Sequence, residues 1–220
     1  MLLDAGDLGV HSGTQEIMKA VPNDSKRPAE WIAQYIKHFS LPLKNNGALD
    51  YALLTHFDTD HIGQNGKLAI EKVGLDYKLT GITHVGNLLN ISTLIDRGYP
   101  TYDYPTAAKV SNYKLYVAAR DREGKKNEGF VIGSNSQIKL LKDPGSYPTF
   151  EVRNIVGNGK IWTGSGTTAK ELVPSTASSS EQLNENRCSC GIRITYGNFD
   201  YFSAGDILGV EKAPEWFDIE

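Results

Sequence analysis

One short segment, residues 55–63, constrains this chain more than any other. Its sequence is Thr-His-Phe-Asp-Thr-Asp-His-Ile-Gly, and it directly follows the apolar run at residues 51–54. A buried strand that ends in a tight turn can aim several side chains at one point. The segment therefore predicts a strand over residues 49–55 that delivers a turn carrying His56, Asp58, Asp60 and His61.

The residue types in this turn favour a metal site. Neutral imidazole and carboxylate groups suit divalent first-row metals, and this spacing can divide the donors between two adjacent ions. The alternative is a polar loop that contains two histidines without binding a metal. A match to five fixed positions is expected by chance in on the order of one chain in ten thousand or fewer, which favours the metal site.

The same segment resembles a known family signature. Its pattern, His-x-Asp-x-Asp-His-x-Gly, is similar to the His-x-His-x-Asp-His motif of the metallo-β-lactamase fold superfamily, with Asp58 in place of the second histidine. The aspartate variant resembles the nuclease-like domains of bacterial competence DNA-uptake (ComEC-type) proteins. Residues 1–6 resemble the first motif of the superfamily, and residues 186–206 resemble its later hairpin and strand-end motif. The resemblance does not cover most of residues 64–185.

This resemblance implies a fold and a domain organisation. We expect an α+β fold, a four-layer αβ/βα sandwich of two mixed β-sheets with outer helices, incomplete at the termini. One domain should span residues 1–220, with a tyrosine-rich insertion around residues 74–113 and a polar loop around residues 163–185. The sequence starts within an expected strand and ends soon after Asp206. We therefore expect a chain from which segments at both ends are missing.

The resemblance also implies roles for particular residues. His56 and Asp58 would hold one ion, Asp60 and His61 the other, and Asp206 would bridge the two. Asp60 would also take part in catalysis. Asp4 would orient ligands from outside the coordination sphere. The expected cofactor is two divalent ions: zinc first, with manganese, magnesium or iron as alternatives because carboxylates make the site harder.

Charge gives an independent reason for cations here. Asp58, Asp60 and Asp206 brought to one place would repel one another and raise each other's pKa. Two divalent cations and one hydroxide would neutralise three carboxylates. The chemistry expected of such a site is metal-assisted hydrolysis.

Histidines that the superfamily usually supplies are missing. The five histidines are His11, His38, His56, His61 and His84. His84 is the candidate for an intermediate ligand, but it follows His61 too closely, and a polar residue of the insertion is favoured instead. His38 is expected on a helix surface, and His11 in a loop near the site.

Composition limits the kinds of protein that this chain can be, but it does not identify a substrate. The chain has 220 residues, of which 40% are apolar, which is enough for one sizeable core. No apolar run approaches the roughly 18 residues that cross a bilayer, and no signal peptide is visible. The net charge of −3 provides no general attraction to nucleic acid. A small-molecule and a nucleic-acid substrate both stay open, as do the compartment and the oligomeric state.

Periodicity predicts several elements. Residues 28–39 should form a helix that buries a stripe of large side chains, from Trp31 to Phe39, against a sheet. Strands are expected at residues 130–132, 137–141 and 150–156, followed by a hairpin over residues 192–202. The tyrosines of residues 74–113 are expected to pack an irregular segment onto the domain; stacking on a substrate is the alternative.

Three functions follow. The first, which makes the chain an enzyme, is metal-dependent hydrolysis of a phosphodiester or similar substrate. The second is hydrolysis of a carbonyl substrate such as a lactam, lactone or thioester. The third is a non-catalytic binding module that retains the fold. The fold cannot choose among them, because one scaffold hosts many chemistries.

Overall fold

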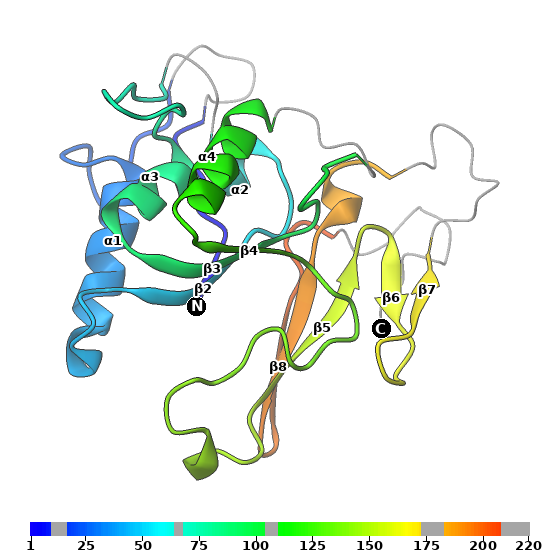
Figure 1. The fold of residues 1–220 in the computed structure, drawn as a ribbon. Coiled ribbons are helices and arrows are strands. Elements are labelled where there is room, and N and C mark those ends of the chain that lie inside the picture. Colours follow the sequence, from blue (N-terminus) through cyan, green and yellow to red (C-terminus); the bar gives the residue numbers. More distant parts are fainter. Residues whose placement is uncertain (10–16, 64–67, 104–109, 173–182, 208–220) are drawn as a thin grey trace. The chain divides into compact units, whose positions relative to one another are not determined.

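The protein is an α+β molecule with one sheet built on parallel strands and one antiparallel sheet (Figure 1). The structure, a computed structural model, describes residues 1–9, 17–63, 68–103, 110–172 and 183–207. The chain forms two compact units. The first contains Met1–Ile95 and Ala107–Glu128, and the second contains Asp96–Thr106 and Gly129–Glu220. The α+β class is thus confirmed. The sandwich arrangement and the single domain stay predictions.

The first unit contains the four-stranded sheet, in the order β1-β2-β3-β4. These strands are β1 (Leu2–Leu3), β2 (Leu49–Leu53), β3 (Ile91–Asp96) and β4 (Lys126–Gly129). β1, β2 and β3 pair in parallel, with Ala52 opposite both Leu2 and Leu94. Parallel neighbours need crossover connections, and three helices lie in them: α1 (Pro28–Phe39) between β1 and β2, and α2 (Thr59–Ile62) and α3 (Gly81–Leu88) between β2 and β3. α4 (Ser111–Arg122) lies between β3 and β4 in the sequence.

Helix α1 has the bounds that the sequence predicts, but its buried face differs. Pro28 occupies the first turn, and Glu30 accepts a hydrogen bond from the Arg27 backbone N–H. The buried residues are Ala29 and Ala33, whereas the side chains of Tyr35 and Phe39 are 66% and 62% exposed. The expectation of a buried aromatic stripe is therefore wrong for these two residues. α1 packs against α3, and small side chains allow two helices to approach closely.

The described part of residues 74–113 contains regular secondary structure. It contains all of α3 and β3 and the start of α4. β3 is an internal strand of the sheet, and Ile91, Leu94 and Ile95 on it are almost fully buried. Tyr77, Tyr102 and Tyr113 are also buried, in agreement with the expected packing role. Tyr104 lies outside the described residues.

The second unit contains the five-stranded antiparallel sheet, in the order β7-β6-β5-β8-β9. Its strands are β5 (Glu151–Gly157), β6 (Lys160–Trp162), β7 (Ala169–Glu171), β8 (Gly191–Tyr196) and β9 (Phe199–Ser203). The predicted strand at 150–156 and the predicted hairpin are confirmed. β7 lies within the predicted polar loop, of which residues 173–182 are outside the described part. Short 3-10 turns are η1 (Leu41–Leu43), η2 (Pro144–Ser146) and η3 (Asn186–Cys188).

The strands predicted at 130–132 and 137–141 are absent from the structure, which describes both segments. Side-chain amides take the place of a strand ladder here. The Gln137 side chain accepts a hydrogen bond from the Val131 N–H and donates one to the Gly129 carbonyl. Asn154 of β5, which is fully buried, donates to the Val131 carbonyl. Backbone groups satisfied in this way do not need a neighbouring strand.

None of the helices in the described part of the chain has both the length and the apolar character needed to cross a membrane.

Candidate metal centre

The end of β2 leads directly to the first histidine, which is buried. Past the strand, the Leu54 N–H still donates to the Ile95 carbonyl at 2.9 Å. His56 and Phe57 follow, with relative exposures of 0% and 1%. The Phe57 ring contacts that of Tyr113, with centroids 5.7 Å apart. Burial of Phe57 therefore anchors the loop between His56 and Asp58.

The short helix α2 places the second histidine. The N–H groups of His61 and Ile62 both donate to the Asp58 carbonyl. Ile62 is buried, whereas the side chain of His61 is 16% exposed. The rings of His56 and His61 thereby come within 4.0 Å between centroids.

At three glycines around α2, backbone segments come too close together to leave room for a side chain. The Ala5 N–H donates to the His61 carbonyl at 2.9 Å. A Cβ atom on Gly6 would lie 1.8 Å from the Asp60 carbonyl oxygen, and one on Gly81 would lie 2.4 Å from that of Ile62. Gly63 and Gly81 also have positive φ angles of 102° and 46°. Residues with a Cβ atom would not fit at Gly6, Gly63 and Gly81, which together form the glycine joint.

Asp4 connects both histidine-bearing segments. Its Oδ1 accepts from the Thr55 N–H at 2.7 Å, and its Oδ2 accepts from the Thr55 hydroxyl at 2.7 Å. The same Oδ2 lies 2.9 Å from Nδ1 of His61. Asp4 has a positive φ of 53°, a conformation in which aspartate is among the more tolerated residues.

These contacts favour one tautomer for each ring. Because the Asp4 carboxylate accepts, His61 Nδ1 must donate to it. The Thr55 hydroxyl uses its one proton on Asp4, so at 3.1 Å it accepts from Nδ1 of His56. Each neutral ring then has its lone pair on Nε2, the atom that binds metals. Asp4 thus contacts His61 directly and His56 through Thr55, whereas its predicted role of orienting metal ligands stays a prediction.

Asp58 and Asp60 lie near the histidines in pairs. Asp58 Oδ2 is 3.7 Å from Nε2 of His56, and Asp60 Oδ2 is 3.6 Å from Nε2 of His61. The side chains of Asp58 and Asp60 are 36% and 75% exposed. His56 and His61 offer ligand nitrogens within 4.8 Å of each other. Among the described residues of the first unit, no carboxylate or thiol lies within that distance of both.

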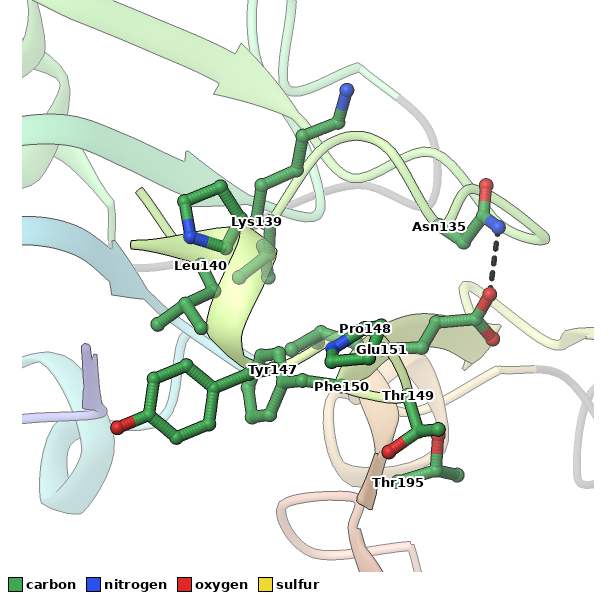
Figure 2. A pocket seen from close by; sticks show the side chains of 12 residues that line it. Asn135, Lys139, Leu140, Tyr147, Pro148, Thr149, Phe150, Glu151 and Thr195 are labelled. Atoms are coloured by element: carbon green, nitrogen blue, oxygen red, sulfur yellow. Dashed lines mark hydrogen bonds between the residues drawn. The ribbon is translucent and has the colours of Figure 1, made fainter. Parts of the chain in front are cut away.

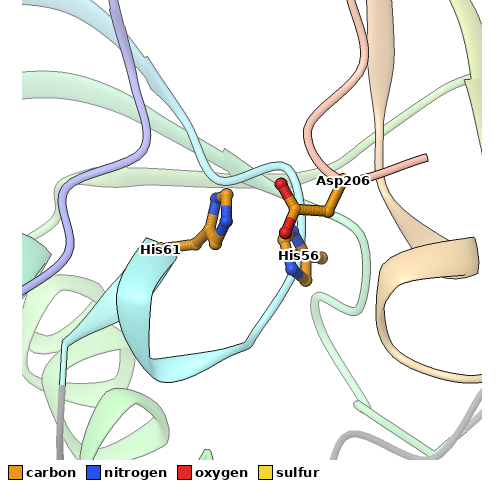
Figure 3. A group of neighbouring side chains, drawn as sticks. All are labelled: His56, His61 and Asp206. Atoms are coloured by element: carbon orange, nitrogen blue, oxygen red, sulfur yellow. The ribbon is translucent and has the colours of Figure 1, made fainter. Parts of the chain in front are cut away.

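Asp206 belongs to the second unit, where it follows β9. Its backbone N–H donates to the Ser189 hydroxyl at 3.2 Å, and its side chain is half-buried. Figure 3 draws Asp206 together with the two histidines. The two histidines belong to the first unit, and the association of Asp206 with them enters below as a proposal.

The other histidines lie apart from this pair. His84 is buried on α3, and Asp7, Glu30, Arg27 and Lys72 are the charged groups that act on it. Burial lowers the pKa of His84 below 6.5, so the ring is neutral near pH 7. His38 is exposed on α1, as expected. His11 lies outside the described residues.

Sequence reasoning missed two residues that organise this region. Thr55 links Asp4 to His56, and its position directly before the histidine motif was the available signal. Asp7, whose side chain is 1% exposed, accepts from Arg27 at 3.0 Å and from the Thr80 hydroxyl at 2.8 Å. It therefore connects the segment after Asp4 to the starts of α1 and α3. Its signal was the close sequence position to Asp4.

The second unit has a hollow of its own, with a volume of about 570 Å³ (Figure 2). None of the predicted metal ligands lines it. Of its lining groups, the Asn135 side chain donates a hydrogen bond to Glu151 at 2.7 Å. Among the described residues, none of this lining belongs to a group of His, Cys, Asp or Glu side chains close enough to hold a metal.

Comparisons with models of protein families, with curated proteins and with solved structures found no match.

Proposed function

We propose that this protein is a metal-dependent hydrolase of the metallo-β-lactamase fold superfamily that acts on a phosphodiester or a similar substrate. The observation that carries the proposal is the paired orientation of His56 and His61. Both rings have Nδ1 in contact with Thr55 or Asp4, an arrangement in which the ring lone pair lies on Nε2, the atom that binds metals. Structural histidines have no general need for this arrangement, whereas metal-binding histidines use it as a rule.

In this proposal, Asp206 would supply a third donor to an ion held by the two histidines. Among the described residues of the first unit, no third His, Cys, Asp or Glu side chain lies within reach of both imidazoles. Two nitrogens and one carboxylate are a donor set that suits zinc, with iron or manganese as alternatives. The residues present therefore fit a divalent ion.

Asp58 and Asp60 extend the proposed site towards a second ion. Each lies close to a different histidine, at 3.7 and 3.6 Å between the carboxylate oxygen and Nε2. His56 with Asp58 and Asp60 with His61 would then form two half-sites, with Asp206 between them. The exposure of Asp60, at 75%, leaves its carboxylate accessible for proton transfer with a substrate or water.

The bound ions would supply Lewis-acid activation of the substrate and a lowered pKa for water. The protein contributes orientation. Asp4 holds His61 directly and His56 through Thr55, so the two rings are arranged before any ligand arrives. Burial of His56 excludes bulk water from one side of the proposed site.

Metal content is the decisive first measurement. The purified protein should hold about two equivalents of zinc, manganese or iron by elemental analysis. His61→Ala should lose this metal, because it removes one of the paired Nε2 donors. His38→Ala is the matched control: it deletes an exposed histidine of α1 and should leave the content unchanged.

Activity then separates the candidate reactions. Turnover of bis-p-nitrophenyl phosphate with added manganese supports the phosphodiester proposal. Turnover of a lactone or thioester alone moves the assignment to carbonyl substrates. Metal loss in both histidine variants alike, or no bound metal in the original protein, contradicts the proposal. An Asp60→Ala variant that loses stability, in a protein without any turnover, indicates a binding module.

A further inference from the structure

The outer edge of the antiparallel sheet, β9, has less protection than the other sheet edges, with Asp200 as its one charged residue. Sheet edges are usually shielded by short length, by charge or by proline, because they can pair with other chains. β1 has two residues, β4 contains Lys126 and Glu128, and β7 contains Lys170 and Glu171. β9, Phe-Asp-Tyr-Phe-Ser, has five residues and neither lysine nor proline.

The side chains on this edge strand are largely exposed aromatic rings. Phe199, Tyr201 and Phe202 are 61%, 49% and 44% exposed. Tyr196, opposite Phe199 on β8, is 47% exposed, and its ring contacts that of Tyr147 at 6.0 Å. So much exposed aromatic surface on two faces of one hairpin indicates a surface that associates.

The hairpin register determines which backbone groups of β9 point outwards. Tyr196 and Phe199 flank a two-residue turn, so they form a hydrogen-bonded pair, and the ladder alternates from there. Phe199, Tyr201 and Ser203 therefore bond to β8. The N–H and C=O groups of Asp200 and Phe202 point away from it, and no described strand pairs with that side.

We propose that β9 is an interface for a second copy of this chain, with the two β9 strands antiparallel about a twofold axis at Tyr201. This register places Asp200 opposite Phe202 of the second copy. Those are the residues with outward backbone groups, so four interchain hydrogen bonds form. Tyr201 then faces its own copy in a non-hydrogen-bonded pair, where side chains come closest and aromatic pairs are favourable.

The charges on this edge favour a second copy of the chain over a strongly basic or strongly acidic partner. The edge carries one charged side chain, Asp200, and Arg193 of the same hairpin lies 3.7 Å from it. A strongly basic or acidic partner would find no free charge to neutralise. Another β9 brings an aromatic strand whose single charge is already countered, and in this register no charge stands opposite a like charge.

The mass of the full chain in solution tests the pairing. Light scattering after size exclusion should give twice the chain mass of 24.2 kDa. Tyr201→Lys should reduce it to one chain, because two lysines would face each other across the axis. Tyr201→Glu should do the same. An equimolar mixture of these two variants should recover the doubled mass, since lysine then faces glutamate.

Phe199→Lys is the matched control, an exposed aromatic residue on the same face of the same strand. It would stand opposite Ser203 of the second copy, so the doubled mass should persist. Circular dichroism of each variant checks that the hairpin is folded. A single-chain mass for the original protein overturns the proposal, as does equal behaviour of the position 199 and 201 variants, or no recovery in the mixture. In these cases a different protein or a nucleic acid becomes the candidate partner of the aromatic edge.

Discussion

The Thr55 hydroxyl makes two hydrogen bonds that can be removed with little change in shape, because valine is nearly isosteric with threonine. Thr55→Val removes the hydroxyl that contacts Nδ1 of His56 and leaves Asp4 Oδ2 with one donor fewer. We expect metal affinity to fall by about 10- to 100-fold, the usual effect of removing a partner of a ligand. Competition with a chelator of known affinity measures the change.

Thr93→Val is the control for this prediction, because Thr93 is also buried, on β3. It should leave metal affinity unchanged. An equal loss of affinity in both variants would mean that the effect comes from general destabilisation and that the bonds of Thr55 have no specific role.

His84 gives the first unit a predictable response to acid. Burial lowers its pKa below the unfolded value of 6.5, and its Nδ1 has no hydrogen-bond partner among the described atoms. Around and below pH 6.5 the unfolded chain therefore binds more protons than the folded one. Stability should decrease as the pH falls from 6.5 to the folded pKa and should not decrease further from this cause.

Urea unfolding at a series of pH values measures this response. His84→Gln should flatten the dependence over that range, whatever it does to stability at neutral pH. His38→Gln, on the exposed part of α1, should retain the full dependence. A slope in His84→Gln as steep as in the original protein would show that other groups cause it.

Some residues of the candidate site could be predicted from the sequence, and others could not. His56, Asp58, Asp60 and His61 are visible because their spacing is compact and rare. Thr55 and Asp7 were missed because a single threonine or aspartate is common in any chain. Their importance comes from hydrogen bonds between segments far apart in sequence, as between Asp7 and Thr80, and no local pattern contains that information.

At the level of elements, the joint between the first motif and α2 should tolerate no side chain. Gly6→Ala would place a Cβ atom 1.8 Å from the Asp60 carbonyl oxygen, a backbone atom that cannot turn away. We expect a loss of about 1–3 kcal/mol in the free energy of unfolding, typical of overpacking, together with weaker metal binding. Denaturant unfolding and metal titration check the two effects.

Gly145→Ala is suited as the control, since a Cβ atom there meets no other atom within 4 Å. Its unfolding free energy should stay within about 0.5 kcal/mol of the original value, as for most surface substitutions. A Gly6→Ala protein as stable as this control would show that the backbone joint can open without cost.

Elements with strong local signals were predicted well. Pro28 and helical spacing defined α1, and alternation defined β8 and β9. The buried face of α1 was predicted wrongly because periodicity identifies an apolar stripe but does not reveal the partner helix. β3 was missed because its apolar run is short and lies between two stretches with many turn residues.

At the level of the whole molecule, the two cysteines can report opening of the second unit. Cys188 and Cys190 are 1% and 0% exposed, and burial raises the pKa of Cys188 to about 11 from its ordinary 9.0. Two pKa steps reduce the thiolate fraction about a hundredfold, so iodoacetamide should modify the folded protein at least that much more slowly than the unfolded one.

Mass spectrometry of the modified protein over a denaturant series measures this protection. The Cys190→Ala variant isolates the response of Cys188. Fast modification of the folded protein would contradict the burial of both thiols.

The division into two units was beyond the reach of the sequence. Each unit is built from two separate segments of the chain. The chain passes from one unit to the other near residues 95–107 and 128–129. That partition depends on which distant strands pair, and no composition shift marks it. The α+β class was predictable because it depends only on which elements exist.

The glycine joint around Gly6, Gly63 and Gly81 limits how a site of this kind can change over evolutionary time. Where three backbones touch with no side chains between them, the spacing is set by covalent geometry, and substitution there cannot adjust it gradually. New preferences for metal or substrate would have to arise by exchanging the groups that the joint presents, Asp58 and Asp60 first, while the position of His61 stays constant. Among related sequences, substitutions should be frequent around Asp58 and Asp60 and rare at the three glycines.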